Sequence, residues 1–406
     1  MLQKYKKETK TQSLHILFEW IWLFFGKKYV SSHQNSKLLK IPDPMWMLVF
    51  TLLPLSALAY IGWHVWCLLP LSWIWKVLII ALMTGAFLLM FAGIMRSTDR
   101  MPMPLAIAVY EVGTSSIIIL LYLFILFLVL DLGRLFHLLP RSLFYNNWWT
   151  IGGIAIGMFA LFLYGYLHYQ HKHREELHLT TEKHLTKPTK LVMMSDLHLG
   201  YHNRRSELHR WVDLINAEQP DVILMAGDII DGSMRPLLEQ QMHEEFQRLK
   251  APVFACIGNH EYYSGEPRAR QFYQDAGIRL LQDSCVYIGD LCLIGRDDRS
   301  NFRRDSLGVL MKKADRSKYC ILLDHQPYHL DQAERQQIDF QFSGHTHHGQ
   351  VWPISWITEH VYECAFGPYQ RGNTHYYVTS GIGIWGGKFR IGTRSEYVVM
   401  TLTGSH

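Results

Sequence analysis

The sequence has few of the residues from which several common kinds of site are built. Its 406 residues include only six cysteines and no Cys-x-x-Cys pair, so we expect free thiols, and neither a disulfide framework nor a thiolate zinc site. It contains no Gly-x-Ser-x-Gly motif, which argues against a serine nucleophile on a strand-to-helix turn. The formal net charge of +5 is small for this length and predicts no nucleic-acid partner.

Charged residues are scarcest in the first half of the chain. A helix needs about 20 apolar residues to cross a bilayer, and four segments meet this requirement: 45–68, 71–95, 105–130 and 148–167. Tryptophan and tyrosine lie near several of their ends, as in the aromatic belts of membrane proteins. We therefore expect an all-α transmembrane region of about four helices over residues 45–168.

The polar segments around this region predict its orientation. Residues 1–44 carry eight lysines around a short apolar patch, which indicates either an interfacial helix or a disordered basic tail. Residues 169–189 are polar and rich in histidine and lysine, like a juxtamembrane linker. Because lysine and arginine are enriched in both segments, we expect the two ends of the chain to lie in the cytoplasm.

Residues 190–406 have the pattern of an α/β domain. Apolar runs of strand length alternate with segments such as 205–219, in which apolar residues recur at helical spacing. Two sheets with helices on their outer faces, in four αββα layers, would bury these apolar faces.

Five apolar runs of this domain end in polar residues that can bind metal ions. These residues are Asp196 and His198, Asp228, Asn259 and His260, His325, and His345 and His347. Because open α/β sheets build their sites at the carboxyl ends of strands, we expect these side chains to meet. Oxygen and imidazole ligands together suit Mn²⁺, Fe or Zn²⁺. Asp228 is the candidate to bridge two ions, because Gly227 before it permits close backbone approach.

Each of these motifs has a simpler interpretation when it stands alone. Asp-x-His is most often a turn with a hydrogen-bonded histidine, Gly-Asp a helix N-cap, and Gly-Asn-His a turn. Their occurrence in series on five expected strand ends favours one dinuclear metal site.

The same motifs resemble the signature of the calcineurin-like metallophosphoesterases. The resemblance covers about residues 190–402 and rests on Asp196-Leu-His198, Gly227-Asp228, Gly258-Asn259-His260, His325 and Gly344-His345-Thr346-His347. Segments 344–350, 381–385 and 389–392 are similar to a subgroup of bacterial phosphodiesterases that includes YkuE and YaeI. The resemblance implies an αββα metallophosphoesterase sandwich in residues 190–406, anchored in a bacterial inner membrane, and the charge bias described above places this domain on the cytoplasmic side.

The resemblance also implies roles for individual residues. Asp196, His198 and His347 would hold one metal ion, Asn259, His325 and His345 the other, and Asp228 both, with Mn²⁺ expected and Fe or Zn²⁺ as alternatives. His260 would protonate the leaving oxygen or stabilise charge in the transition state. Glu261 replaces the aspartate that orients this histidine in many members. His348 replaces a glycine, so it could contact substrate or narrow the pocket.

The expected reaction is hydrolysis of a phosphodiester or pyrophosphate bond. A domain tethered to a membrane is well placed to act on membrane lipids, such as a UDP-2,3-diacylglucosamine-like substrate or a phospholipid. A general phosphodiesterase or phosphatase on soluble substrates and a non-catalytic metal-binding scaffold or sensor are the alternatives. Five aromatic residues could form an apolar lip for acyl chains or belong to the core: Trp352, Trp356, Tyr362, Phe366 and Trp385.

Overall fold

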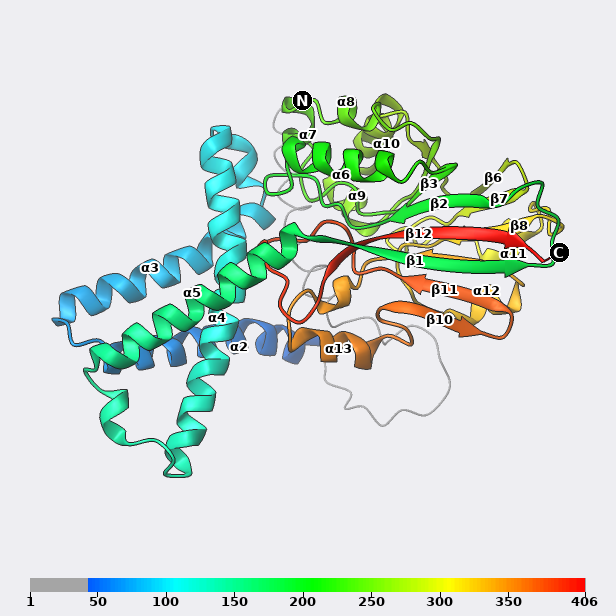
Figure 1. Cartoon of the computed structure of the whole chain (residues 1–406). Helices are drawn as coiled ribbons and strands as arrows, with labels where there is room; N and C mark the ends of the chain where they lie inside the picture. The colour runs from blue at the N-terminus through cyan, green and yellow to red at the C-terminus, as the bar shows by residue number, and fades with distance from the viewer. Residues whose placement is uncertain (1–42, 406) are drawn as a thin grey trace. The chain divides into compact units, whose positions relative to one another are not determined.

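The computed structural model of the chain describes residues 43–405 (Figure 1). Two compact units are present, one ending at Leu161 and the other beginning at Phe162. Each unit has its own apolar core, which in the first unit includes Ile61 and Phe127. The expected basic tail, residues 1–44, lies outside the described residues except for its last two positions.

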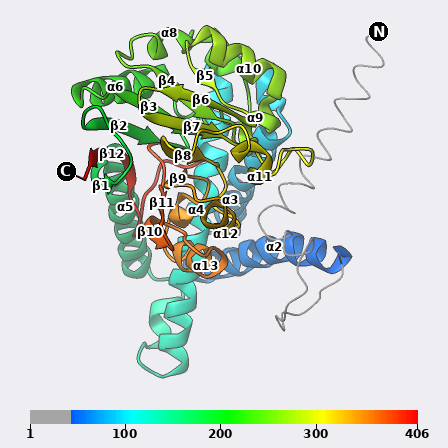
Figure 2. The same cartoon turned by 90° about the vertical axis from the view of Figure 1, so that its right-hand side faces the viewer.

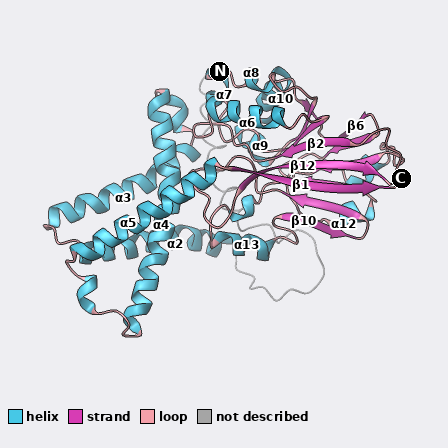
Figure 3. Ribbon diagram, in the orientation of Figure 1, coloured by secondary structure: helices cyan, strands magenta, loops and turns pink. Residues whose placement is uncertain are grey.

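The first unit consists of apolar helices joined by short loops (Figure 3). They are α2 (Asp43–Leu68), α3 (Trp73–Ile94), α4 (Met103–Leu135) and α5 (Trp148–Gln170), which continues into the second unit, with 3-10 turns at Ser97–Arg100 and Arg141–Phe144. Within residues 43–405, three segments are long and apolar enough to span a membrane, at Trp73–Gly93, Met103–Leu135 and Trp148–Gln170, and Leu52–Leu68 is a shorter apolar helix. The prediction of an apolar helical region is confirmed, and the three long helices indicate membrane anchoring.

The outward faces of these helices are apolar as well. Leu82 is 73% exposed and Trp149 is 90% exposed. Exposing such apolar side chains to water is unfavourable, whereas contact with lipid chains is not. Where α3 and α4 meet, a Cβ on Gly113 would lie 2.5 Å from the backbone nitrogen of Met90. Small residues at helix contacts are typical of membrane proteins, because close backbone packing replaces the hydrophobic driving force between helices.

The second unit contains two six-stranded mixed sheets that pack face to face (Figure 2). The first has the order β1 (Lys172–Thr181), β12 (Ser395–Gly404), β2 (Thr189–Met194), β3 (Val222–Ala226), β4 (Val253–Cys256) and β5 (Arg279–Leu280). The second has the order β10 (Gly367–Arg371), β11 (Thr374–Val378), β9 (Phe340–Ser343), β8 (Tyr319–Leu323), β7 (Leu291–Gly295) and β6 (Ser284–Ile288). Strands β2 to β5 are mutually parallel, as are β7, β8, β9 and β11.

Alternate side chains of the strands enter different cores. In β2, Val192 and Met194 pack beneath helices, whereas Leu191 and Met193 pack between the sheets, as the two-residue period of a strand requires. The helices are α6 (Arg205–Ala217), α7 (Arg235–Glu239), α8 (His243–Phe246), α9 (Asn259–Ser264), α10 (Glu266–Asp275), α11 (Leu307–Met311), α12 (Asp331–Arg335) and α13 (Ile354–Val361). Because α6 and α10 cover one sheet and α11 and α12 the other, the predicted αββα architecture is confirmed.

The segment 169–189, which we expected to be a polar linker, contains a strand of the first sheet. Lys172–Thr181 forms β1 and pairs in parallel with β12 over its whole length. Leu177 and Leu179 pack against the core between the sheets, while the polar residues between and beside them are exposed. Much of this segment is therefore part of the folded domain, on the edge of a sheet, and its exposed polar face explains why it resembles a linker.

Replacing Leu179 with alanine tests whether β1 contributes to the stability of the domain. Leu179 is 8% exposed, so we expect Leu179→Ala to lower the free energy of unfolding by about 2–5 kcal/mol. Thr180→Ala on the exposed face should change it by less than about 0.5 kcal/mol. Thermal unfolding of the detergent-purified full chain measures both variants, and equal stabilities would show that β1 is only a tether.

Candidate metal centre

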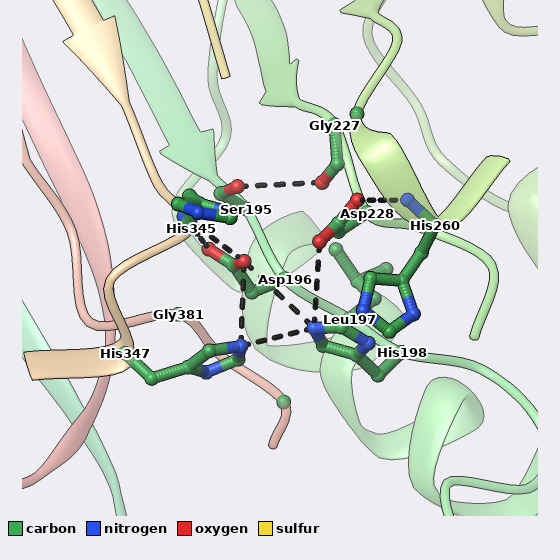
Figure 4. A network of polar contacts seen from close by, with 12 residues as sticks. Ser195, Asp196, Leu197, His198, Gly227, Asp228, His260, His345, His347 and Gly381 are labelled. Atoms are coloured by element: carbon green, nitrogen blue, oxygen red, sulfur yellow. Dashed lines mark hydrogen bonds and ion pairs between the residues drawn. The ribbon is translucent and has the colours of Figure 1, made fainter. Parts of the chain in front are cut away.

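Polar side chains at the ends of five strands meet at one edge of the second unit. Figure 4 shows those of Asp196, His198, Asp228, His260, His345 and His347. Asp196 and His198 follow β2, Asp228 follows β3, Asn259 begins α9 after β4, His325 follows β8, and His345 and His347 follow β9. The strands are parallel within each sheet, and the two sheets share a core. Their carboxyl ends therefore lie together, as the positions of these residues predicted.

Among the described residues, histidines and carboxylates form three close groups, within each of which the ligand atoms lie no more than 4.8 Å apart, and His198, Asp231 and His260 make up one of them. Expected metal ligands make up the other two. One group is Asp196, His198 and His347, and the other is Asp228, His325 and His345. Asp228 Oδ2 lies 3.0 Å from His325 Nε2 and 3.8 Å from His198 Nε2. This carboxylate thus lies between the groups, where a ligand shared by two metal ions would have to be.

The backbone around Asp228 explains its position. β3 lies between β2 and β4 in the sheet. Gly227 has a φ of +80°, and a Cβ there would lie 2.7 Å from the backbone nitrogen of Gly258, so glycine is required by both conformation and space. Asp228 Oδ1 accepts a hydrogen bond from the backbone N–H of His260 at 2.9 Å. The loops after β3 and β4 are therefore joined through this carboxylate.

Backbone strain is concentrated at the same place. Five site residues have φ between 45° and 72°, in the left-handed region: Asp196, His198, Asp228, His345 and His347. Such conformations cost roughly 1–3 kcal/mol each, and their clustering is typical of functional sites. Here they are held by hydrogen bonds between strand ends, such as the 3.0 Å bond from the His198 N–H to the Asp228 carbonyl.

Asn259 supplies a test of whether metal ions fit this arrangement. Its side chain is 4% exposed, and its Oδ1 has no hydrogen-bond partner among the described residues. A buried acceptor without a donor costs about 1–3 kcal/mol, and coordination to a cation would remove this cost. The groups contain carboxylates and imidazoles and no cysteine, a donor set that suits Mn²⁺, Fe or Zn²⁺. The residues present therefore fit a pair of metal ions.

Burial and charge set the protonation of the site. Burial, with the positive charge of His325, lowers the pKa of His345 to about 3, and burial lowers that of His347 well below its usual range. Both imidazoles are then neutral at neutral pH, as metal ligands must be. Burial opposes ionisation of Asp228, but the charges of His325 and His260 outweigh it and hold the pKa of Asp228 well below normal.

The structure adds Asp231, which the sequence analysis missed. Its carboxylate lies 3.2 Å from His198 Nδ1 and 3.3 Å from His260 Nδ1. Burial disfavours charge on His198, but hydrogen bonds to Asp196 and Asp231 raise its pKa to about 10. A cation at Nε2 would displace a proton and leave Nδ1–H directed at Asp231, which is the usual arrangement for metal-binding histidines. The available signal was an acidic residue three positions after Asp228.

Glu261 supports the loops of the site. Its carboxylate is fully buried and accepts hydrogen bonds from the backbone N–H groups of Gly258, Asp228, Ile229 and Ile230 and from the Tyr273 hydroxyl. Its distances to these donors are 2.8–3.1 Å. The carboxylate beside the His260 ring belongs to Asp231 and not to Glu261. Asp231 therefore makes the contact that we expected from residue 261, the one that orients His260.

His348 connects α13 to residues 344–350, the loop after β9 that carries the expected ligands His345 and His347 and that we call the ligand loop. Its Nε2 lies 2.7 Å from a carboxylate oxygen of Glu359. Its ring stacks on Phe366 with centroids 4.5 Å apart. These contacts place His348, which follows His347 in the chain, against the helix after this loop.

Arg390 is a second residue that the sequence analysis did not assign to the site. Its side chain is fully buried, and its guanidinium donates hydrogen bonds to the carbonyls of His347, Ser380 and Gly383 at 2.6, 2.5 and 3.3 Å. Burial lowers its pKa to about 10, which leaves it a cation at neutral pH. Arg390 therefore holds the backbone of the loop that carries His347.

An αββα sandwich with two groups of histidine and carboxylate at its carboxyl edge defines a metal-dependent phosphoesterase. The family model of the calcineurin-like phosphoesterases matches residues 189–349, a range that contains all seven expected ligands. A metallophosphoesterase of Aquifex aeolicus is 33% identical over 245 residues, which are 57% of this chain and 91% of that protein. The chain belongs to the calcineurin-like metallophosphoesterase family, as the motifs implied.

Two further relatives define the extent of the similarity. YkuE of Bacillus subtilis, a metallophosphoesterase, is 29% identical over 269 residues, which are 60% of this chain and 91% of YkuE. This confirms the resemblance to YkuE. A metallophosphoesterase of Helicobacter pylori (strain J99) is 31% identical over 225 residues, or 54% of this chain, and the chain spans 60% of the length of that relative.

The Glu261→Gln variant tests the structural role of Glu261. A glutamine amide offers one acceptor oxygen, so it would leave backbone N–H groups of the two loops without partners. We expect a loss of at least about 2 kcal/mol in the free energy of unfolding, whereas the exposed Glu182→Gln should be within about 0.5 kcal/mol of the parent. Denaturant unfolding measures both. Unchanged stability in Glu261→Gln would contradict the role described above.

Proposed function

We propose that this chain is a membrane-anchored dinuclear-metal phosphoesterase that hydrolyses a phosphodiester or pyrophosphate bond of a lipid-linked substrate. The observation that carries the proposal is the buried carboxylate of Asp228, 3.0 Å from His325 and 3.8 Å from His198. These histidines belong to separate ligand groups. A carboxylate shared in this way suits two metal ions about 3.5–4 Å apart.

The ligands divide between the two proposed metal positions according to their groups. We assign Asp196, His198 and His347 to one ion, Asn259, His325 and His345 to the other, and Asp228 to both. Mn²⁺ is the proposed metal, with Fe or Zn²⁺ as alternatives that the same donors allow. Bound there, the ions would supply a nucleophile at neutral pH by lowering the pKa of water, and would polarise a phosphoryl oxygen.

His260 is the proposed acid that protonates the leaving oxygen. Its ring is nearly buried and meets the His198 ring edge to face, with centroids 4.5 Å apart. Because Nδ1 lies 3.3 Å from Asp231, a proton on Nδ1 is held by that carboxylate and the transferable proton is carried by Nε2.

The membrane anchor supports a lipid-linked substrate. α5 ends at Gln170 and β1 begins at Lys172, so the catalytic domain starts within two residues of a membrane-spanning helix. We propose a UDP-2,3-diacylglucosamine-like lipid or a phospholipid as substrate. We place the domain in the bacterial cytoplasm because lysine and arginine flank the helices on that side. The six cysteines, all described, are free, which suits a reducing compartment.

Two other functions use the same residues differently. A general phosphodiesterase would need the metal site and His260 but no lipid recognition. A metal-binding scaffold or sensor would need the ligands alone. The position of the His260 ring beside that of His198 favours catalysis over a scaffold, because His260 is not one of the proposed ligands and metal binding by itself requires no further imidazole at that place.

Metal exchange in the detergent-purified protein tests the function. We expect chelation to abolish hydrolysis, Mn²⁺ to restore it, and UDP-2,3-diacylglucosamine to be cleaved faster than the soluble bis(p-nitrophenyl) phosphate. Asp228→Asn should bind fewer than two ions per chain by elemental analysis, whereas Asp213→Asn, an exposed carboxylate on α6, should bind as many as the parent. Equal rates would favour a general phosphodiesterase, and metal binding without hydrolysis of either substrate would favour a scaffold.

The His260→Ala variant tests whether His260 acts as a general acid or as a metal ligand. We expect turnover to fall by roughly 10²–10⁴-fold, the contribution of a general acid, with metal content unchanged. His178→Ala, on the exposed face of β1, is the matched control and should keep full turnover. Full activity in His260→Ala would remove the acid assignment, and loss of metal would show that His260 acts as a ligand.

A further inference from the structure

The helix that follows the ligand loop exposes two polar residues, Glu359 and His360, and several large apolar ones. α13 spans Ile354–Val361, and its exposed apolar residues are Trp356, Ile357 and Val361, which are 62, 49 and 53% exposed. Trp352, 37% exposed, packs against Trp356 with ring centroids 5.3 Å apart. We call these four residues the α13 surface. A helix on a domain surface in water normally turns its polar side outward, so this surface indicates an apolar partner.

The start of α13 is joined to the end of the membrane-spanning helix α5. The Trp352 N–H donates a 2.7 Å hydrogen bond to the carbonyl of Ile391. The Ile391 side chain fills the space beside Gly165 of α5, where a Cβ would lie 2.9 Å from it. The next residue back along the chain, Arg390, donates its backbone N–H to the Gly165 carbonyl at 3.0 Å. Ile391 thus contacts both Trp352 and α5.

The aromatic residues near Gly165 indicate the level of the membrane surface. Tyr164 and Tyr166 are both exposed on the last turns of α5, and tyrosine and tryptophan concentrate at the headgroup level of membranes. Trp352, held beside Gly165 through Ile391, lies at this level. We propose that the α13 surface docks into the headgroup–acyl boundary of the bilayer that α5 crosses.

The same helix is packed against the loop that carries the metal ligands. A Cβ on Gly349, two residues after His347, would lie 2.4 Å from the backbone nitrogen of Ser355 in α13. Glu359 of α13 lies 2.7 Å from His348 Nε2. Docking of α13 therefore brings the ligand loop to the lipid surface, where the phosphates of lipids lie. This consequence for the substrate rests on the proposed function, whereas the docking itself does not.

Depth-dependent fluorescence quenching in the full-length protein tests the docking. A fluorophore sensitive to polarity is attached at Ile357→Cys or, in a second variant, at Val361→Cys, after the partly exposed Cys67 and Cys285 are replaced by serine. The protein is reconstituted in phosphatidylcholine–phosphatidylglycerol vesicles that contain lipids brominated at different positions of the acyl chain. We expect blue-shifted emission and strongest quenching by bromine near the top of the chain, at a depth of about 5–10 Å.

Tyr287→Cys is the matched control. Tyr287 is 45% exposed and pairs with the start of β7, at the opposite end of the sheet from the ligand-bearing strand ends. Its label should have the emission of a water-exposed dye and be quenched by iodide, with no effect of brominated lipid. The same behaviour at both Ile357 and Val361 would overturn the proposal.

Two other results would also be decisive. Blue-shifted emission that brominated lipids do not quench would show that protein covers the α13 surface, either a second copy of the chain or its own segment 1–42, and would overturn the proposal. Since the readout does not depend on hydrolysis, an inactive protein with α13 in the bilayer would overturn the proposed function alone. An active protein with α13 in water would overturn the docking alone.

Discussion

The candidate site depends on the apolar core that joins the two sheets. Leu224 and Phe254 of the first sheet and Phe340 and Phe342 of the second are buried in that core, which holds the sheets face to face. Each ligand group draws residues from both sheets: Asp196 and His198 from the first with His347 from the second, and Asp228 from the first with His325 and His345 from the second. Neither group exists in one sheet alone, so apolar packing is the condition for the metal centre.

Two buried charged side chains hold the strained loops that this core brings together. The carboxylate of Glu261 collects the backbone N–H groups after β3 and β4, and the guanidinium of Arg390 collects the carbonyls of His347 and two other residues. Charged partners make the stronger hydrogen bonds of a protein interior, which offsets the cost of left-handed backbone at the ligands. Because Arg390 also binds Gly165 of α5, the support of the site and the attachment to the last membrane-spanning helix use the same loop.

The structural features that could be predicted are those that depend on residues close together in the sequence. Apolar helices long enough to span a membrane follow from composition over about 20 residues. The ligand positions follow from strand periodicity, because a polar residue directly after a buried parallel strand has to lie at the carboxyl edge of the sheet. For the same reason, the αββα layers and the meeting of Asp228 with His325 were expected before the arrangement was known.

The remaining features depend on contacts between residues far apart in the chain. β1 has the polar composition of a linker, and only its pairing with β12, more than 200 residues later, makes it a strand. Asp231, and not Glu261, lies beside the His260 ring because of how two loops pack. The sequence by itself therefore determined the family, the residues that meet at the candidate metal centre and the long apolar helices, through local pattern. The tertiary structure decided which buried charges support the ligands and where the apolar face of α13 lies, because long-range packing has no local signal.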